Sequence, residues 1–356
     1  MHNENPLLDT ELVHKIDADL EQFIKQWQTD QTIGSPEPID AFGNILLRGG
    51  KRLRGVLAVK SYKAFGGKDE QVALGAARVF EIIQTSLLIV DDIADRSMLR
   101  RGGPSVHSML EHYATEHHLK GSSLHYGQVQ AMNVAYAGVH KAAYELLQLK
   151  VDPETVRRAC SRFHENILVT VNGQVDDIYN EVTPNEVTEQ NIEDVLKRKS
   201  AYYSILSPIE LGAQLAGIAE LPEELRAYAI HAGCAYQIAD DIISTFGRED
   251  ETGKGHNDDI REGKLTLLTQ FGLAHATADQ KQLLRTALGN ETLTDDMCDA
   301  VRACLRETGA LEHAKERLTF HKEQALGCLD KAKASTPASL VAYLHDLTEY
   351  LVARKA

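Results

Sequence analysis

The hydrophobic and polar positions along this chain follow a helical pattern. Long stretches rich in Ala, Leu, Ile, Glu and Lys are separated by glycine and proline, and few segments show the period-two alternation of a half-buried strand. We therefore expect helix nearly throughout. Breaks between helices are expected near residues 34–38, 49–50, 66–67, 102–104, 152–153, 183–184 and 222, and the polar, glycine-bearing stretch 247–263 is expected to be a loop.

These breaks lack the long Pro/Gly/Ser-rich composition of an interdomain linker, and the chain shows no repeat of fixed period. Its 356 residues are enough for one large domain or for two of ordinary size. The simplest interpretation is a single all-α domain over residues 1–356, in which residues 1–35 form a mobile N-terminal segment.

Composition and charge narrow the class of protein. Hydrophobic residues make up 43% of the chain and charged residues 25%, which is the balance of an ordinary globular protein. The formal net charge of -14 disfavours nucleic acid and anionic membrane surfaces as partners. An anionic substrate would therefore have to be bound by local basic clusters and metal ions.

Cysteine usage and the N-terminus bear on the cellular compartment. The five cysteines, an odd number without zinc-type spacing, indicate reduced thiols in the cytoplasm. The N-terminus lacks the basic start and apolar stretch of a signal peptide, and no apolar run approaches the roughly 20 residues that cross a bilayer. We expect a cytoplasmic protein without a membrane span.

One expected helix, residues 79–94, is apolar on nearly every side, yet its end carries the aspartates of Asp91-Asp92-Ile93-Ala94-Asp95. At about 3.6 residues per turn, Asp91 and Asp95 share a face, and Gln84 lies about two turns behind them. Such close carboxylates repel one another, and a hard divalent cation such as Mg²⁺ compensates them. A lone pattern of this kind also fits a solvated acidic helix end.

Basic residues next to this helix favour the metal interpretation. Arg96, Arg100 and Arg101 precede a turn at residues 102–104. Guanidinium forks match phosphate geometry and a metal bridges the remaining oxygens, so the combination indicates a diphosphate site. Upstream, Gly49-Gly50 precede an expected helix on which Lys51 and Arg54 share one face. Alone, this basic cluster fits a solvated surface. Together with the arginines that follow Asp95, it suggests a second anion site.

A second acidic helix repeats the arrangement. Gln237, Asp240, Asp241 and Ser244 lie on one helical face. Two Asp-Asp pairs on separate helices suggest that aspartates of both helices coordinate one cluster of metal ions. The interpretation therefore requires two acidic stretches from distant parts of the chain to meet across one cavity.

Lysines accompany the second acidic helix. Lys254 and Lys264 flank the glycine-bearing loop, and Lys199-Ser200 lie within another expected helix. Lysines that converge on such a site would neutralise the charge that develops on a departing diphosphate.

With these motifs in place, the sequence resembles the trans-isoprenyl diphosphate synthase (polyprenyl synthetase) family, which includes farnesyl and geranylgeranyl diphosphate synthases. The resemblance runs from about residue 49 to residue 268. Its motifs occur in the family's order: GGKRLR, DDIADRSMLRRG, His125-Tyr126-Gly127, Gly173-Gln174 with Asp177, Lys199-Ser200, Gln237-Ile238 before Asp240-Asp241, and the GKG and EGK segments around Lys254 and Lys264.

The resemblance implies an isoprenoid synthase-like fold, a helical bundle around a central active-site cavity. The implied reaction joins an allylic diphosphate to isopentenyl diphosphate: the allylic diphosphate ionises, the homoallylic double bond attacks, and a proton leaves with the departing diphosphate as base. Metal ions and cationic side chains would supply electrostatic stabilisation without a covalent protein intermediate. The implied cofactor is Mg²⁺, as three ions with diphosphate bound, and the implied assembly is a homodimer.

The resemblance also implies a role for each candidate residue. Isopentenyl diphosphate would be bound by Lys51, Arg54, Gln84 and Arg101. The allylic diphosphate would be served by Arg100, Lys264 and the catalytic residues Lys199, Ser200, Gln237 and Lys254. Magnesium would be held by Asp91, Asp92, Asp95, Asp240 and Asp241, with Asp91, Asp95 and Asp240 as the principal ligands.

Two positions depart from the family's pattern. Ser244 stands where the second motif usually ends in an aspartate; its hydroxyl can still bond a metal-bound water, so we expect weaker metal affinity with activity retained. Tyr136 stands where many relatives carry aspartate, and nothing in the sequence explains it.

Product length in this family depends on bulky side chains just before the first aspartates, which close the floor of the elongation tunnel. Here those positions hold Ser86 and Leu87, neither of them aromatic. Farther back, at about 5.4 Å per turn, Ile83 and then Phe80 lie close to the face that carries Asp91. We expect Phe80 to form the floor and the product to be geranylgeranyl diphosphate, with a farnesyl or longer product as the alternative.

Two other functions fit part of the pattern. A terpene cyclase has a second metal motif of the form (N/D)xx(S/T)xxxE. Asp240 and Ser244 match this motif, but Arg248 stands in place of its glutamate. A cyclase would also bind no isopentenyl diphosphate, so the GGKRLR segment would have no ligand. A non-catalytic partner subunit of a heteromeric synthase would fit Ser244 and Tyr136, but such subunits usually lose the first aspartates, which are present here.

Overall fold

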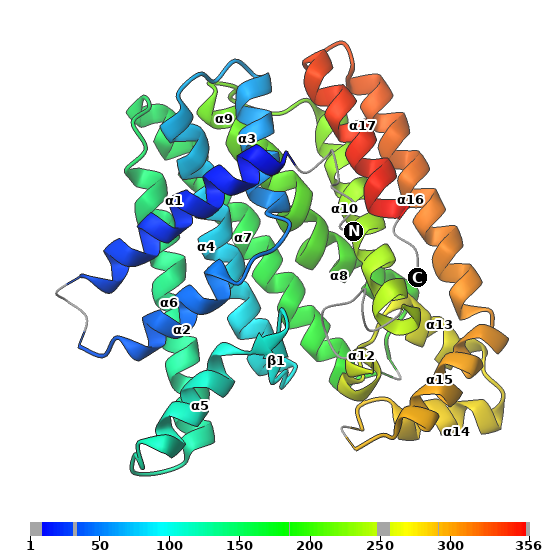
Figure 1. The fold of residues 1–356 in the computed structure, drawn as a ribbon. Helices are drawn as coiled ribbons and strands as arrows, with labels where there is room; N and C mark the ends of the chain where they lie inside the picture. Colours follow the sequence, from blue (N-terminus) through cyan, green and yellow to red (C-terminus); the bar gives the residue numbers. More distant parts are fainter. Residues whose placement is uncertain (1–8, 31–33, 185, 248–256, 291, 354–356) are drawn as a thin grey trace. The chain divides into compact units, whose positions relative to one another are not determined.

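The computed structural model describes residues 9–30, 34–184, 186–247, 257–290 and 292–353. Within these residues the chain is helical almost throughout, which confirms the all-α prediction (Figure 1). The exception is a hairpin in which β1 (Leu99–Arg100) pairs antiparallel with β2 (Gly103–Pro104). Its two turn residues, Arg101 and Gly102, have φ of 52° and 72°, the positive values that a tight two-residue hairpin turn requires.

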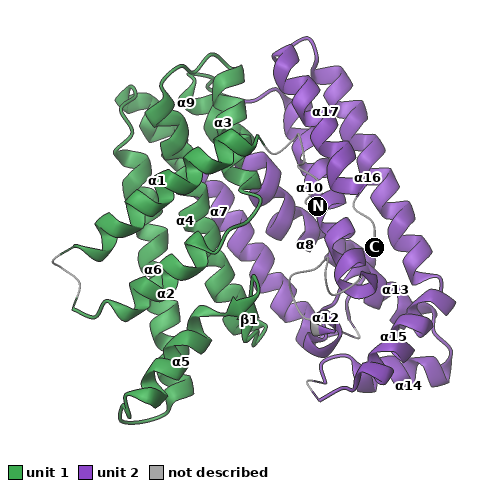
Figure 2. Cartoon of the chain, viewed as in Figure 1, with its two compact units in different colours: residues 1–162, 208–220 green, residues 163–207, 221–356 purple. Residues whose placement is uncertain are grey.

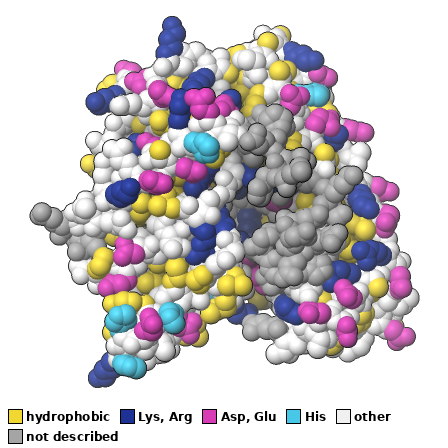
Figure 3. Space-filling model, in the orientation of Figure 1, with side chains coloured by type: hydrophobic (Ala, Val, Ile, Leu, Met, Phe, Trp, Pro, Cys, Tyr) yellow, Lys and Arg dark blue, Asp and Glu magenta, His cyan; other side chains and the backbone are white. Residues whose placement is uncertain are grey.

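The chain divides into two compact units (Figure 2). Unit 1 contains residues 1–162 and 208–220, and unit 2 contains residues 163–207 and 221–356. The single domain that we expected stays a prediction, and each unit is described by itself. On the face in Figure 3, Lys and Arg side chains are interspersed with Asp and Glu side chains on the described residues of both units, as is typical of solvated surface.

Unit 1 is built from helices that surround α4. In chain order these are α1 (Thr10–Gln28), α2 (Glu37–Leu47), α3 (Leu53–Ala64), α4 (Glu70–Ala94), α5 (Val106–Glu116), α6 (Ser123–Leu147), the start of α7 (Pro153–Val182) and most of α9 (Ser207–Leu215). Helix α9 approaches α3 closely, because a Cβ added at Gly212 would lie 2.3 Å from the Ala58 carbonyl oxygen.

Helix α1 lies within residues 1–35, where we expected a mobile segment. The Asp9 carboxylate caps it by accepting a hydrogen bond from the Leu12 amide, and Leu12, Ile16 and Leu20 on its apolar face are buried. It packs against α2, α3 and α4, and Lys15 pairs with Glu70 at the start of α4. The described part of this segment is therefore a packed helix, because its apolar stripe supplies enough buried surface to dock it.

Helix α4 corrects one expectation from the sequence. Among the described residues it is the one helix whose length and apolar composition would suffice to cross a membrane, although we expected no such stretch. However, 72% of its apolar window is buried inside the protein, and it packs against α3 and α6. Burial on this scale is typical of the central helix of a core rather than of a lipid-facing span.

Unit 2 is organised around α10, which packs against η1, α16 and α17 (Figure 1). Its elements are the remainder of α7, α8 (Glu189–Val195), η1 (Leu196–Leu206), α10 (Glu223–Phe246), α12 (Asp258–Glu262), α13 (Leu267–His275), α14 (Ala278–Ala287), α15 (Asp295–Glu307), α16 (Ala310–Ala332) and α17 (Ala338–Val352). The hydroxyl of Tyr228 on α10 donates to the Leu344 carbonyl of α17 at 2.9 Å, which ties these helices together inside the core.

Two elements of unit 2 differ from the expected pattern. Residues 258–262 form the short helix α12 inside the stretch 247–263 that we expected to be a loop; its last turn ends at Gly263, whose φ of 77° provides a left-handed cap. The segment around Lys199-Ser200 is a π-helix, η1, rather than ordinary α-helix. Wide turns of this kind are rare and frequently occur at functional sites.

The cysteines are free thiols. Cys160, Cys234, Cys298, Cys304 and Cys328 all lie in the described residues, and none forms a disulfide there. The reduced state and the cytoplasmic compartment that we inferred from them stay predictions.

Candidate active site

The first acidic motif lies at the end of α4, as the sequence predicted. Asp91 is half-buried, Asp92 is buried, and Asp95 is the residue that ends the helix. The Arg100 Nε donates to Asp92 Oδ1 at 2.6 Å, and its Nη2 lies 3.6 Å from Asp91 Oδ2. Burial opposes the charge of Arg100, but the Asp92 carboxylate outweighs it and holds the guanidinium pKa above its ordinary value. Arg100 thus binds Asp92 and also lies within ion-pair distance of Asp91. The role of Asp91 and Asp95 as cation ligands stays a prediction.

The arginines after α4 are placed by the β-hairpin. Arg100 belongs to β1, and the Arg101 Nη1 donates to the Ile45 carbonyl at 3.1 Å. Arg48 Nη1 donates to the carbonyls of Arg100 and Pro104, at 2.6 and 2.9 Å, and so holds both hairpin strands. The sequence did not single out Arg48, because nothing near position 48 indicates that its side chain would bond carbonyls of residues 100 and 104.

The GGKRLR segment lies beside this hairpin and adds positive charge. The Arg101 guanidinium lies 3.4 Å from the position a Cβ would take at Gly50, so the glycine leaves room for it. Burial lowers the pKa of Arg101, and the positive charges of Arg52, Arg100 and Arg54 lower it further, although Glu81 opposes them. Two motifs that are distant in sequence thus form one basic cluster in unit 1.

The structure corrects our expectation for Lys51. Helix α3 begins at Leu53, so Lys51 precedes it and does not share a helical face with Arg54. Arg52 takes the position before the helix with φ of 48°, and its buried side chain donates to Asp17 at 2.8 Å and to Glu81 at 3.0 Å. Arg52 therefore anchors the segment inside the core, whereas Lys51 is exposed and precedes the first residue of α3.

The other candidate residues on α4 differ in burial. Gln84 is half-buried, and its Oε1 is buried without a hydrogen-bond partner among the residues that the structure describes. Phe80 and Ile83 are completely buried, and Leu87 is half-buried. The Gln84 side-chain oxygen is therefore a hydrogen-bond acceptor without a partner on the same helical face as Asp91. Phe80, one turn farther toward the start of α4, is buried in the core.

Ser86 faces the neighbouring helices of unit 1. Its hydroxyl donates to the Ile82 carbonyl at 3.1 Å and would lie 2.3 Å from a Cβ added at Gly138 of α6. The Phe42 ring of α2 comes within 2.8 Å of the same point. The absence of a side chain at Gly138 thus makes room for the Ser86 hydroxyl and the Phe42 ring against α6.

In unit 2, three of the predicted residues form a hydrogen-bonded chain. Ser200 Oγ on η1 donates to Gln237 Oε1 at 2.9 Å, and Gln237 Nε2 donates to Asp241 Oδ1 at 2.8 Å. Lys264 Nζ lies 4.0 Å from Asp241 Oδ1. Burial raises the pKa of Asp241 to about 6, although Lys264 and the Gln237 hydrogen bond act to lower it. Asp241 is therefore a buried acceptor within the unit.

Three further residues singled out from the sequence lie on α10 and η1. Asp240 and Ser244 of α10 are half-buried. Lys199 Nζ of η1 donates to Asp177 Oδ2 of α7 at 2.6 Å, so a buried aspartate orients this lysine. Lys254 lies outside the described residues.

Two glycines fix the position of η1, and sequence analysis missed their role. A Cβ at Gly173 of α7 would lie 2.4 Å from the Lys199 amide nitrogen, and a Cβ at Gly233 of α10 would lie 2.4 Å from Ala201 Cα. Only glycine allows backbones to approach this closely. Isolated glycines inside expected helices were the available signal for such contacts.

Metal binding can be judged from the acidic residues of each unit. Among the described residues, no group of three or more His, Cys, Asp or Glu side chains has a geometry that could hold a metal ion. Mg²⁺ is typically bound by one or two carboxylates together with substrate phosphates and water, so it needs no such protein cage. The assignment of Asp91 and Asp95 in unit 1 and of Asp240 in unit 2 as ligands therefore stays a prediction.

Comparisons with known proteins identify the family of this chain. The family model for polyprenyl synthetase matches residues 37–305. A geranylgeranyl diphosphate synthase of Saccharolobus solfataricus is 30% identical over 346 residues, 95% of each chain, and an octaprenyl diphosphate synthase of Escherichia coli is 29% identical over 80% of this chain and 81% of its own. The solved structure of a Corynebacterium glutamicum geranylgeranyl pyrophosphate synthase, complexed with isoprenyl diphosphate and magnesium, is 29% identical with a TM-score of 0.89, covering 96% of this chain and 98% of its own. The chain therefore belongs to the polyprenyl synthetase family and is a prenyltransferase.

Proposed function

We propose that this enzyme condenses an allylic diphosphate with isopentenyl diphosphate head-to-tail and releases geranylgeranyl diphosphate. The observation that carries the proposal is the match over 95% of both chains to a geranylgeranyl diphosphate synthase. The aspartates and arginines at the end of α4, which serve ionisation of the allylic substrate, support it. Relatives with longer products are similar at 27–29% identity, so product length is the part that experiment must decide.

Magnesium is the proposed cofactor, because the Corynebacterium glutamicum enzyme was solved with magnesium and isoprenyl diphosphate. We assign Asp91, Asp95 and Asp240 as principal ligands, with Asp92 and Asp241 beside them, and three ions per substrate complex. When bound, the metal supplies electrostatic stabilisation of the departing diphosphate. Ser244 would contribute only a neutral oxygen, so weaker metal affinity is the expected consequence of that position.

The chain's own residues provide the cationic surroundings of the two diphosphates. Lys51, Arg54, Gln84 and Arg101 are assigned to isopentenyl diphosphate. Gln84 would donate through its Nε2 amide, because the oxygens of a diphosphate accept hydrogen bonds. Arg100, Lys199, Ser200, Gln237, Lys254 and Lys264 are assigned to the allylic diphosphate. The ion pair with Asp177 holds the Lys199 ammonium group in place without substrate.

The proposed reaction needs no reactant besides the two diphosphates. The allylic carbon–oxygen bond breaks, diphosphate leaves with the electron pair, and the isopentenyl double bond forms the new carbon–carbon bond. The proton lost from the adjacent carbon goes to the departing diphosphate. Preorganised cations lower the barrier because charge develops on the leaving group in the transition state.

One assay tests the function. Purified enzyme is incubated with Mg²⁺, isopentenyl diphosphate and a dimethylallyl, geranyl or farnesyl primer, and the products are separated by chromatography. The proposal expects consumption of isopentenyl diphosphate and a geranylgeranyl product. No consumption with any primer would refute it and favour the non-catalytic subunit, and a cyclic hydrocarbon would favour a terpene cyclase.

Product length is assigned to Phe80. Its ring lies on the Asp91 side of α4, about 16 Å back along the helix at 1.5 Å per residue, and is completely buried. Phe80→Ala should remove this barrier and lengthen the product in the same assay. Ile82→Val, a change at a buried residue on the opposite side of α4, serves as the control. An unchanged product from Phe80→Ala would remove Phe80 from this role.

A homodimer is the proposed assembly. Helix α7 exposes an apolar stripe at helical spacing, Leu168, Val171, Val175, Tyr179 and Val182, with 42–73% of each residue accessible. A continuous exposed stripe of this kind typically marks an interaction site, and a second copy of the chain is the occupant we propose. Val175→Glu should convert a dimer to a monomer in light scattering, and a wild-type monomer would refute the assembly.

A further inference from the structure

Glu193 in the last turn of α8 is the centre of a polar cluster in unit 2. Arg317 of α16 donates to Glu193 Oε1 through Nε at 2.9 Å and through Nη2 at 2.8 Å. His321, one turn later on α16, contacts Glu193 Oε2 through Nε2 at 3.0 Å. Both carboxylate oxygens are therefore engaged from α16, with 14% of the Glu193 side chain accessible.

The cluster extends to α10 through a second histidine. His231 Nδ1 lies 3.0 Å from His321 Nδ1. Because a carboxylate only accepts, His321 Nε2 carries a hydrogen toward Glu193, and in the neutral ring its Nδ1 accepts from the His231 Nδ1–H. Burial acts to raise the pKa of Glu193, but the hydrogen bonds from His321 and Arg317 outweigh it and hold that pKa below its ordinary value. The carboxylate thus stays charged and joins α8, α16 and α10.

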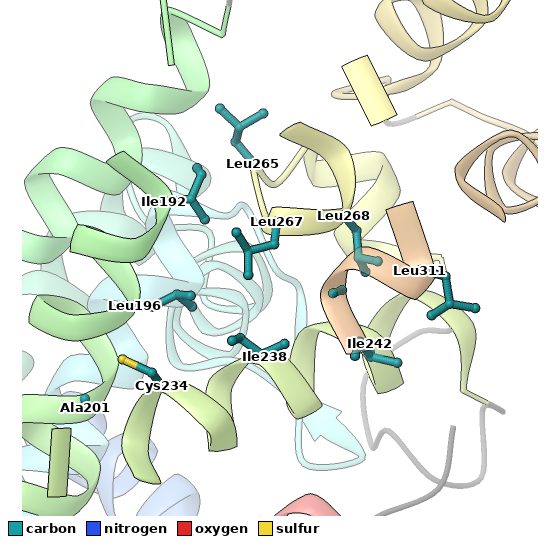
Figure 4. Packing of buried hydrophobic residues seen from close by; sticks show 11 residues of the cluster. Ile192, Leu196, Ala201, Cys234, Ile238, Ile242, Leu265, Leu267, Leu268 and Leu311 are labelled. Atoms are coloured by element: carbon teal, nitrogen blue, oxygen red, sulfur yellow. The ribbon is translucent and has the colours of Figure 1, made fainter. Parts of the chain in front are cut away.

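Glu193 is joined to η1 by continuous helical backbone. Helix α8 ends at Val195 and η1 begins at Leu196, without an intervening loop. Lys199 and Ser200 follow within the first turn of this π-helix. Helix α8 and η1 also share an apolar cluster with α10, in which Ile192, Leu196 and Ala201 lie with Cys234 and Ile238 (Figure 4).

The fit of η1 leaves little tolerance for displacement. Gly173 and Gly233 admit its backbone at distances that no other residue would allow. Ser200 must remain within hydrogen-bond reach of Gln237, and Lys199 within reach of Asp177. The apolar cluster is not directional, whereas the charged hydrogen bonds at Glu193 are. They therefore hold the helix three residues before the start of η1, in addition to the close glycine contacts within it.

We propose that Glu193, with His321, Arg317 and His231, is a positioning group that sets the π-helix so that Lys199 and Ser200 are aligned for the allylic diphosphate. This inference rests on the proposed function, because it takes the allylic diphosphate as the ligand of η1. None of the four side chains needs to touch the substrate. Their action is on the placement of the element that does.

The test compares Michaelis constants for the two substrates. Glu193→Gln removes the charge at nearly constant shape, and His321→Leu removes the histidine donor, whereas His321→Gln retains an amide N–H near the Nε2 position. The control is Glu349→Gln, which breaks an ion pair that Lys322 of the same α16 makes with α17 at 2.7 Å, away from η1. Thermal unfolding of every variant accompanies the kinetics.

The proposal expects Glu193→Gln and His321→Leu to raise KM for the allylic diphosphate about tenfold, since a misplacement of about 1 Å can cost up to about a hundredfold in rate. The KM for isopentenyl diphosphate should stay unchanged, and His321→Gln and Glu349→Gln should resemble the wild type. Equal changes in both KM values, or loss of stability with unchanged kinetics, would overturn it.

Two further outcomes are also decisive. If Glu193→Gln fails to fold, the comparison of His321→Leu with His321→Gln decides, and identical allylic KM values for the two would overturn the proposal. If the wild type forms no product, the proposed function fails. The same variants are then compared by the calorimetric Kd of geranyl diphosphate with Mg²⁺, where an unchanged Kd would overturn the positioning role.

Discussion

Replacing Asp241 with asparagine should make the metal-free protein more stable and the enzyme less active. Asp241 is buried on α10, and burial raises its pKa from 3.8 to about 6 despite Lys264 nearby. A difference of about 2 pKa units corresponds to about 3 kcal/mol of folding free energy, at about 1.4 kcal/mol per unit. Asparagine keeps an oxygen for the Gln237 Nε2 hydrogen bond and carries no charge to desolvate.

The sign of the effect depends on pH. The folded state holds the Asp241 proton more tightly than the unfolded state, so this carboxyl favours folding below pH 3.8, and that contribution is lost as pH rises through about 6. The stabilisation by Asp241→Asn should therefore be close to its full size, up to about 3 kcal/mol, at pH 7.5 and should be much smaller near pH 4.

Urea unfolding in EDTA at pH 7.5 and pH 4 measures this difference, because a shift of the midpoint at unchanged slope reports stability. Prenyl transfer with Mg²⁺ should fall in the same variant, since it lacks one carboxylate of the second motif. The control is Asp346→Asn, an exposed aspartate of α17. A destabilised Asp241→Asn at pH 7.5, or a shift of equal size at both pH values, would refute the reasoning.

Three other substitutions test packing and burial. Gly233→Ala places a Cβ 2.4 Å from the backbone of η1, so it should cost about 1–3 kcal/mol in urea unfolding and should also lower kcat; wild-type activity would contradict the close contact. Arg52→Met leaves the Glu81 carboxylate without its buried partner and should cost about 3–5 kcal/mol, to be checked by thermal unfolding against Lys51→Met, which should be near neutral. Tyr228→Phe loses the hydrogen bond to Leu344 and should cost about 1 kcal/mol at neutral pH. Because burial raises the pKa of Tyr228 above 10.0, the wild type should lose stability above pH 10 more steeply than Tyr228→Phe, and equal slopes would count against this account.

Local patterns in the sequence predicted much of the fold. The apolar stretch before Asp91 is helical and buried, and it ends at the aspartates because charged groups need water, a cation or an arginine. The glycine and proline breaks predicted most helix ends, for example before Pro153, where α7 begins. Helical spacing is a property of neighbouring residues, so it can be read without knowing the tertiary fold.

Other features depended on partners that are distant in sequence. Arg52 and Lys51 are adjacent and chemically alike, yet one is buried between Asp17 and Glu81 and the other is exposed. The π-helix at Lys199 arises where two glycines, 26 residues before it and 34 after it, admit its backbone. No local pattern specifies such pairings, since they are decided by which helices pack together.

The sequence by itself determined that the chain is helical, that carboxylates and basic residues lie at particular helix ends, and that it resembles the polyprenyl synthetases. The tertiary structure decided which charged side chains pair with one another: Asp92 with Arg100, Lys199 with Asp177, and Glu193 with Arg317 of α16. The physical reason is that charge type and helical spacing belong to the local chain, whereas burial and pairing depend on what the completed core brings beside each group.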